Sequence, residues 1–349
     1  MPRPSRLPID AVRTWATREV AAHPRDFTQQ LAAHFGVTRA GAGPLVRQLE
    51  REGFVVRSAG GTRPRFAPGP SRLLAERVAL PGVDESALWE QRFAPWLDLP
   101  DNLSNIVHYA FTEMVNNAND HAGAAWLDVR VMRTVDAVYL AVVDDGIGTF
   151  RRIAQALALP DERLAVLELA KGKFSSDPQR HSGEGVFFTS RAVDAFLLRA
   201  NGLEYRRHQG ERWPARQRLA DLAATTAAGT SVVMAVSLAG QRTLRETFDA
   251  YTLGAPEDYD FDRTVVPVKL AQVGSGNLLS RSQAKRLTSR FERFRRVELD
   301  FAEVQEIGQA FADELFRVFV QAHPQVELVP LNAALPVNAM IRRTGFRPS

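Results

Sequence analysis

The sequence of 349 residues contains no cysteine. This absence excludes disulfide bonds, zinc sites with thiolate ligands and a cysteine nucleophile. The chain also has no apolar run near the roughly 20 residues that a membrane-spanning helix needs. Its first residues, MPRPSRLPID, lack the apolar core of a signal peptide. The composition therefore predicts a cytoplasmic globular protein that does not cross a membrane.

Lysine is scarce, with four residues in the whole chain, so positive charge comes mostly from arginine. Residues 1–80 contain 13 arginines, no lysine and six acidic residues, whereas the rest of the chain has a small net negative charge. A basic segment joined to a nearly neutral body is typical of a nucleic-acid contact at one end of a protein. A solvated basic face is the alternative interpretation.

The predicted elements of residues 1–78 follow the order helix, turn, helix and hairpin. FTQQLAAHF (27–35) predicts a short amphipathic helix, and Thr38 is suited to be the N-cap of a second helix that ends at Gly53. FVVRSAGGTRPRF then alternates in polarity and turns at a glycine pair, as a β-hairpin does. This order resembles the winged helix-turn-helix modules of bacterial DNA-binding proteins.

One residue departs from that pattern. Pro44 falls inside the second helix, beyond the first turn in which proline has no cost, so we expect the helix to begin later or to kink. The resemblance implies DNA as the partner of this module, and a protein partner is the alternative. The candidate DNA contacts are Arg39, Arg47, Arg57, Arg63 and Arg65.

The middle of the chain contains a helix with a dense polar stretch, EMVNNANDHAG. From Leu103 onward, apolar residues recur at helical spacing and form one face of this helix. Glu113, Asn117, Asp120 and His121 recur at the same spacing on another face. One side of the helix is therefore predicted to pack against a core, while the other presents acids and an amide to a ligand.

Two glycine motifs follow this helix. VYLAVVDDGIGTF predicts a buried strand that ends in Asp144, Gly146 and Gly148, where glycine permits positive φ angles and close approach of a ligand. HSGEGVFFTSRAVDAF places Gly183 and Gly185 before an amphipathic helix, whose free N–H groups and positive dipole end suit phosphate. Each motif alone is weak, but their order and spacing predict a nucleotide site.

The three motifs together resemble a known family. Glu-x-x-x-Asn-Ala on a helix, Asp-x-Gly-x-Gly after a strand and Gly-x-Gly before a helix are the pattern of the gyrase, heat-shock chaperone, histidine kinase and MutL (GHKL) ATPase superfamily. AAGTSVVMAVS, which contains Thr230, is similar to the last strand of that family on the adenine side. The resemblance covers residues 84–240 and implies an α/β sandwich that binds ATP under a mobile lid, residues 149–182.

The resemblance also implies a role for each matched residue. Glu113 would be the general base that orients water toward the γ-phosphate, and Asn117 would hold Mg²⁺. Asp144 would accept the adenine amino group, with Thr230 nearby through a water molecule. For Lys171, Lys173 and Arg180 in the lid, a solvated loop is the alternative to phosphate contact. The other candidate ATP contacts are Asp120, Gly146, Gly148, Gly183 and Gly185.

Strands and helices alternate in residues 262–349, which predicts a small α/β layer. VELDFAEVQEIGQAFADELFRVF resembles the STAS-like domains that are appended to bacterial ATPases of this superfamily. The wider STAS group includes proteins that related kinases phosphorylate on Ser or Thr. At that place this chain has Gly308, Gln309, Ala310 and Phe311, none of which carries a hydroxyl. We therefore expect an interaction or regulatory domain with an unidentified protein partner.

These resemblances predict an α/β multidomain protein with a winged helix-turn-helix, a GHKL ATPase domain and a STAS-like domain. We expect a bacterial regulatory protein in which Mg-ATP controls the two flanking domains, with weak ATP hydrolysis and a homodimer as an open option. The alternatives are a Ser/Thr protein kinase of the anti-sigma-factor type and a non-enzymatic DNA-binding or scaffold protein that uses ATP structurally. Asp120, where histidine kinases tend to have a basic residue, argues against that branch, as does the absence of a separate dimerising helix with a phosphoacceptor histidine.

Overall fold

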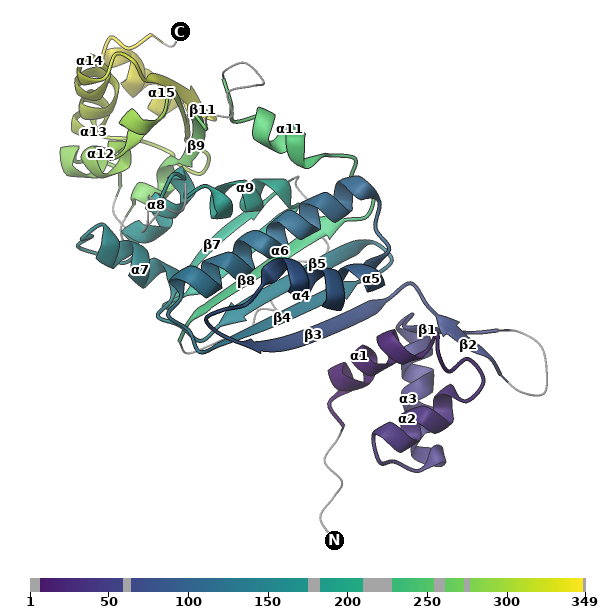
Figure 1. The fold of residues 1–349 in the computed structure, drawn as a ribbon. Coiled ribbons are helices and arrows are strands. Elements are labelled where there is room, and N and C mark those ends of the chain that lie inside the picture. The colour runs from purple at the N-terminus through teal and green to yellow at the C-terminus, as the bar shows by residue number, and fades with distance from the viewer. Residues whose placement is uncertain are drawn as a thin grey trace.

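The computed structural model of this chain shows an α/β protein with three parts, seen in chain order in Figure 1. A small N-terminal domain of helices and a hairpin is followed by a central six-stranded sheet covered by helices, and then by a C-terminal domain with a three-stranded sheet. No helix in the described ranges is long and apolar enough to cross a membrane. The structure describes residues 7–58, 64–174, 183–209, 228–253, 261–272 and 277–347.

Three helices and an antiparallel hairpin make up the N-terminal domain. The elements are α1 (Ile9–Glu19), α2 (Phe27–His34), α3 (Arg39–Arg51), β1 (Val55–Arg57) and β2 (Phe66–Pro68). Only α1 is absent from the elements that the sequence predicts. The Oγ1 atom of Thr38 accepts a hydrogen bond from the N–H of Gly41 at 3.1 Å, which is the predicted N-cap. Helix α3 begins directly after this cap and contains Pro44, so the helix does not begin later.

The first strand of the central sheet, β3 (Arg72–Ala79), pairs with β4 over its full length. The predicted end of the N-terminal domain lies inside this strand, because its proline-rich surroundings hid it from sequence analysis. Helix α1 packs against β3: the N–H of Leu73 donates to Oγ1 of Thr17 at 3.1 Å, and Arg18 forms an ion pair with Glu76 at 2.5 Å. The edge strand therefore joins the N-terminal domain to the central sheet.

The central sheet is antiparallel throughout and has the order β3-β4-β5-β8-β6-β7. Its other strands are β4 (Trp126–Arg133), β5 (Ala137–Asp144), β6 (Ala195–Ala200), β7 (Leu203–His208) and β8 (Thr230–Ser237). Helix α6 (Asp101–His121) crosses one face of the sheet, as Figure 1 shows. Its buried residues include the whole predicted apolar stripe, from Leu103 to Ala118. Five further helices complete this layer: α4 (Glu85–Arg92), α5 (Ala94–Leu97), α7 (Thr149–Ala156), α8 (Leu164–Lys171) and α9 (Gly185–Ala192).

Helix α11 (Leu244–Asp249) leads from the central sheet to the C-terminal domain, where three parallel strands have the order β11-β10-β9. Helices cover this sheet, and strands and helices alternate as the sequence predicts. The strands are β9 (Arg263–Pro267), β10 (Arg296–Asp300) and β11 (Glu327–Leu331). The helical elements are η1 (Val268–Ala271), α12 (Arg281–Thr288), η2 (Phe291–Arg293), α13 (Gln309–Asp313), the π-helical η3 (Glu314–Phe319), α14 (Val320–Ala322) and α15 (Leu335–Arg343).

Candidate functional site

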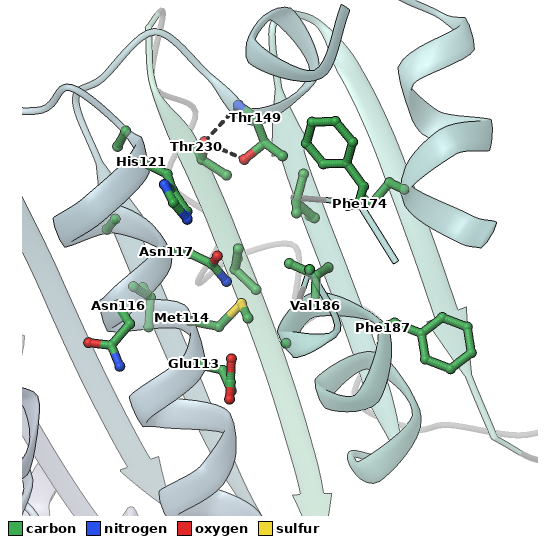
Figure 2. A pocket seen from close by; sticks show the side chains of 18 of the residues that line it. Glu113, Met114, Asn116, Asn117, His121, Thr149, Phe174, Val186, Phe187 and Thr230 are labelled. Carbon is green, nitrogen blue, oxygen red and sulfur yellow. Dashed lines mark hydrogen bonds between the residues drawn. The ribbon is translucent and has the colours of Figure 1, made fainter. Parts of the chain in front are cut away.

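A cavity of about 400 Å³ lies between α6, the central sheet and the start of α9. Its volume is in the range of small-molecule binding sites. Glu113, Asn117 and His121 line it from three successive turns of α6, as Figure 2 shows. Most of the polar face that the sequence predicts for this helix therefore faces a cavity rather than solvent.

Asp144 lies at one end of the cavity, where β5 ends. Its Oδ1 atom accepts hydrogen bonds from the N–H groups of Gly146 at 2.9 Å and Thr230 at 3.1 Å. Burial raises the pKa of Asp144, and these bonds act in the opposite direction. The hydroxyl of Thr230 lies 3.0 Å from the hydroxyl of Thr149 and accepts from the N–H of Thr149 at 3.1 Å. The buried carboxyl group of Asp144 is therefore held in a fixed orientation at this end of the cavity.

The two glycines after β5 are both required by contacts inside the protein. A Cβ atom at Gly146 would lie 2.1 Å from the carbonyl oxygen of Ala122 at the end of α6. Gly148 has a φ of +88°, and a Cβ atom there would lie 2.3 Å from Oδ1 of Asn201. Gly148 lines the cavity, whereas Gly146 is not among the described lining residues. Of the two glycines, Gly148 is therefore the one whose backbone could lie close to a ligand. Gly146 instead lets the loop pack against the end of α6.

Glu113 lies near the other end of the cavity, directly against the glycine turn of α9. A Cβ atom at Gly185 would lie 2.0 Å from Oε2 of Glu113, so only glycine leaves room for this carboxyl group. Burial raises the pKa of Glu113, a hydrogen bond from Tyr109 lowers it, and the charge of Glu184 raises it, with a net increase. Gly183, which has a φ of +73°, also lines the cavity. A carboxyl group with a raised pKa in a cavity is suited to proton transfer.

Asn117 lies between these two ends. Its Nδ2 atom is buried and has no hydrogen-bond partner among the described residues. An unpaired buried amide costs about 1–3 kcal/mol, so it indicates a place where a ligand or water would bind. No group of three or more His, Asp or Glu residues within the described ranges could hold a metal ion by itself. A Mg²⁺ ion at Asn117 would therefore take most of its oxygen ligands from a bound molecule and from water, which is usual for this ion.

Lys171 and Lys173 depart from the sequence expectation, because neither ammonium group faces the cavity. Nζ of Lys171 is fully buried and donates to the carbonyl oxygens of Arg286 at 3.0 Å and Ser289 at 2.9 Å. Nζ of Lys173 donates to the carbonyl oxygen of Arg293 at 3.1 Å. Both lysines thus contact the C-terminal domain rather than a phosphate position. The reason is that the end of α8 packs against that domain.

Two other residues that the sequence suggests as ATP contacts are not seen at the cavity. Asp120 is exposed, its Oδ1 atom accepts from Nδ2 of Asn119 at 3.0 Å, and it is not among the described lining residues. The helix therefore turns Asp120 outward, away from the other polar residues predicted to contact ATP. Arg180 and the part of the predicted lid at 175–182 lie outside the described residues.

Sequence reasoning gave no role to several residues that line the cavity. The sequence placed His121 on the polar face of α6 without giving it a role. In the structure, Nδ1 of His121 lies 3.5 Å from Nη2 of Arg152 in α7. Burial lowers the pKa of Arg152. Phe248 comes from α11, in a stretch that reads as a linker, so no local signal could have found it. Lining residues to which the sequence assigned no role of their own include Tyr109, His121, Thr149, Arg152, Phe174, Glu184 and Phe248.

The arginines predicted to contact DNA have different surroundings. Arg39 and Arg47 are exposed on α3, and Arg65 is exposed beside the hairpin. Arg57 forms an ion pair with Glu50 at 2.7 Å, and its guanidinium lies 5.4 Å from the ring centroid of Phe66. Arg63 lies outside the described residues. Among these candidates, the exposed cations that the structure describes are found on α3 and at the loop end of the hairpin.

Comparison with known proteins identifies one segment of the chain. Residues 283–338 match the family model described as a STAS-like domain of unknown function (DUF4325). A search of curated proteins finds no match. The matched segment extends from α12 into α15, and it confirms the STAS-like domain that the sequence predicts at the C-terminus.

Proposed function

We propose that this protein is an ATP-binding regulatory protein whose central domain binds Mg-ATP in the cavity between α6 and the sheet. The resemblance to GHKL ATPases suggests this ligand. The observation that carries the proposal is the buried, unpaired Nδ2 atom of Asn117, placed between Asp144 and Glu113 in a cavity of about 400 Å³. A ligand or a water molecule bound beside this group would give it the missing hydrogen-bond partner.

The chain's own residues divide the work along the cavity. Asp144 would accept a hydrogen bond from the adenine amino group, because two backbone N–H groups hold its carboxyl in place. Asn117 would hold Mg²⁺ through its amide oxygen; when bound, the ion neutralises charge on phosphate oxygens. Glu113 would orient a water molecule and accept its proton, since burial keeps the pKa of this carboxyl raised. Phosphoryl transfer depends mostly on such positioning, so slow ATP hydrolysis is the expected reaction.

Calorimetric titration with ATP, with and without Mg²⁺, tests the site. We expect Asn117→Ala to lose Mg²⁺-dependent binding, while Glu113→Ala keeps binding and loses hydrolysis. Asn105→Ala is the matched control, because Asn105 is exposed on the same helix and is not among the residues that line this cavity. Unchanged affinity in Asn117→Ala would remove the site assignment. Transfer of labelled phosphate from ATP to an added STAS protein would instead support the protein kinase alternative.

We also infer that the N-terminal domain binds DNA. The support is the excess of arginine over acidic residues in this part of the chain and the exposure of Arg39, Arg47 and Arg65 on one helix and the adjoining hairpin. Binding through phosphate contacts must weaken steeply as salt concentration rises. In this proposal, nucleotide binding in the central domain would change the activity of the two domains that flank it, the DNA-binding domain and the STAS-like domain.

A further inference from the structure

The C-terminal end of α8 receives hydrogen bonds from the C-terminal domain, in addition to one from Arg191 of α9 to the carbonyl oxygen of Ala170 at 3.5 Å. The last carbonyl groups of a helix have no partners within the helix and need donors from elsewhere. Oγ1 of Thr264 donates to the carbonyl oxygen of Lys171 at 2.7 Å. Arg290 donates through Nη2 to the carbonyl oxygen of Gly172 at 3.1 Å and also to that of Lys173. Cationic donors at this end of a helix also interact favourably with its dipole. The C-terminal domain therefore caps α8.

The contact is reciprocal and charged. Nζ of Lys171 donates to backbone carbonyl groups of Arg286 and Ser289 in the C-terminal domain. The carboxyl group of Glu168 holds both cations, with Lys171 at 2.6 Å and Arg290 at 2.9 Å. Burial lowers the pKa of Lys171, and the charge of Glu168 acts in the opposite direction. Buried charges are tolerated only when they are paired, so this network favours the docking geometry in which Glu168 pairs with both cations.

The same segment is also a wall of the cavity. Leu169, Gly172 and Phe174 line it, and Phe174 is seen beside the site in Figure 2. A Cβ atom at Gly172 would lie 2.7 Å from the ring of Phe187 in α9 and 2.8 Å from the ring of Phe261 in the C-terminal domain. The turn after α8 is thus fixed between the helix that begins at the glycine motif and the neighbouring domain. A shift of that domain would move this wall.

We propose that the STAS-like C-terminal domain is a structural part of the nucleotide site, because it positions the wall at 169–174 by capping α8. Glu168, Lys171 and Arg290 act as positioning residues, since none of them is among the described residues that line the cavity. Nucleotide binding and docking of the C-terminal domain then strengthen each other by the same factor. This inference rests on the proposed function, in which the cavity binds ATP. A protein that binds the STAS-like domain and changes its docking would change the affinity for ATP.

Two variants on the C-terminal side test this coupling. Arg290→Met removes the two capping hydrogen bonds of the arginine and one ion pair, while Thr264 still donates to Lys171 and Lys171 still pairs with Glu168. Thr264→Val removes only one hydrogen bond from a buried side chain of nearly the same shape, so it decides the outcome if Arg290→Met does not fold. We expect the Kd for Mg-ATP to rise about 10-fold in Arg290→Met, within the usual range of coupling between sites, and less in Thr264→Val.

The matched controls break contacts that do not cross between domains. Arg317→Met removes an arginine whose ion pair, with Asp313 at 2.5 Å, lies within the C-terminal domain. Thr288→Val removes a hydroxyl that donates to the carbonyl oxygen of Ala284 within α12 at 3.1 Å. Both controls are expected to bind ATP as the wild type does. Melting temperatures measured for all variants separate a loss of coupling from a loss of folding.

Hydrogen–deuterium exchange supplies the reciprocal measurement. We expect Mg-ATP to slow exchange of backbone amides in residues 286–290 of the wild type, and to have no such effect in Arg290→Met. ATP affinity equal to that of the wild type in both Arg290→Met and Thr264→Val would overturn this inference alone. A wild-type chain that does not bind Mg-ATP would overturn both this inference and the proposed function.

Discussion

Two residues, Glu113 and Glu184, determine how we expect ATP hydrolysis to depend on pH. Burial raises the pKa of Glu113, the hydrogen bond from Tyr109 lowers it, and the nearby charge of Glu184 raises it. A general base must be ionised to accept a proton. We therefore expect hydrolysis to decline as the pH falls through a pKa that lies above the ordinary value for glutamate. The decline should begin at a higher pH than an exposed glutamate would give.

The substitution Glu184→Gln tests this electrostatic argument. It removes a negative charge that disfavours ionisation of Glu113, so the pKa of Glu113 should fall and the acid limb of the pH–rate profile should move to lower pH. The measurement is kcat for ATP hydrolysis as a function of pH. Glu162→Gln is the control, because Glu162 pairs with Arg151 and is not among the residues that line the cavity. A shift to higher pH, or none, would contradict the assignment.

Spacing alone could predict some of the candidate site at this scale. Glu113 and Asn117 could be predicted to lie together, because an i,i+4 pair on an amphipathic helix must share a face. The contacts that require glycine could not be predicted. Gly146 and Gly185 are forced by the carbonyl group of Ala122 and by the carboxyl group of Glu113, and neither contact has a local signature in the sequence. A glycine motif therefore marked the right region without revealing which atoms require it.

Helix α8 shows the limit of periodicity at the scale of elements. All eight of its residues are buried, including Glu168 and Lys171. A helix that is covered on all sides has no exposed stripe. The sequence therefore placed Lys171 in a lid, as a phosphate contact or part of a solvated loop, and gave Glu168 no role. Helix α6 is the opposite case, since one apolar face made its extent and orientation predictable. The charged residues of α8 acquire a role only when the C-terminal domain is placed against them.

A prediction for helix α3 concerns Pro44, which lies within the helix and is exposed. Proline has no N–H, so the carbonyl group of Ala40 lacks its donor within the helix. We expect Pro44→Ala to raise the free energy of unfolding of the N-terminal domain by roughly 1–3 kcal/mol, because alanine restores the bond and favours the helix. Exchange protection of α3 amides in the full chain measures this change. Equal or weaker protection would mean that the helix is distorted in a way that alanine does not relieve.

The sequence predicts three parts for the whole molecule, but it does not predict how they are attached to one another. The motifs came in sequence along the chain, and the C-terminal match confirms the last of them. In Figure 1 the N-terminal domain lies beside the edge strand β3, whereas the C-terminal domain lies beside α8 and α9. The contacts that join them, such as Arg18 with Glu76 and Arg290 with Glu168, link distant segments, and a single sequence does not show which charges will meet. The two flanking domains therefore contact different elements of the central domain.

The uneven charge of the whole chain leads to a prediction about DNA. We expect the affinity for double-stranded DNA to fall steeply with salt, because each phosphate contact releases counterions. Arg47→Ala should weaken binding and reduce the slope of log Kobs against log salt by about one. Arg57→Ala should have a smaller effect, since Arg57 is already paired with Glu50. Binding measured by fluorescence anisotropy over a range of salt concentrations gives both quantities.

A truncation identifies the part of the molecule responsible. Removal of residues 1–70 deletes the N-terminal domain and leaves β3 to complete the sheet, whereas a cut at the predicted boundary would remove most of this strand. We expect the shortened chain to keep ATP binding and lose DNA binding. Salt-insensitive binding, or binding that survives the truncation, would show that this domain does not contact the DNA backbone. Helix α3 and the hairpin would then bind a protein partner. Exposed Arg39 and Arg47, and Arg57 in its ion pair with Glu50, could contact a protein as well as DNA.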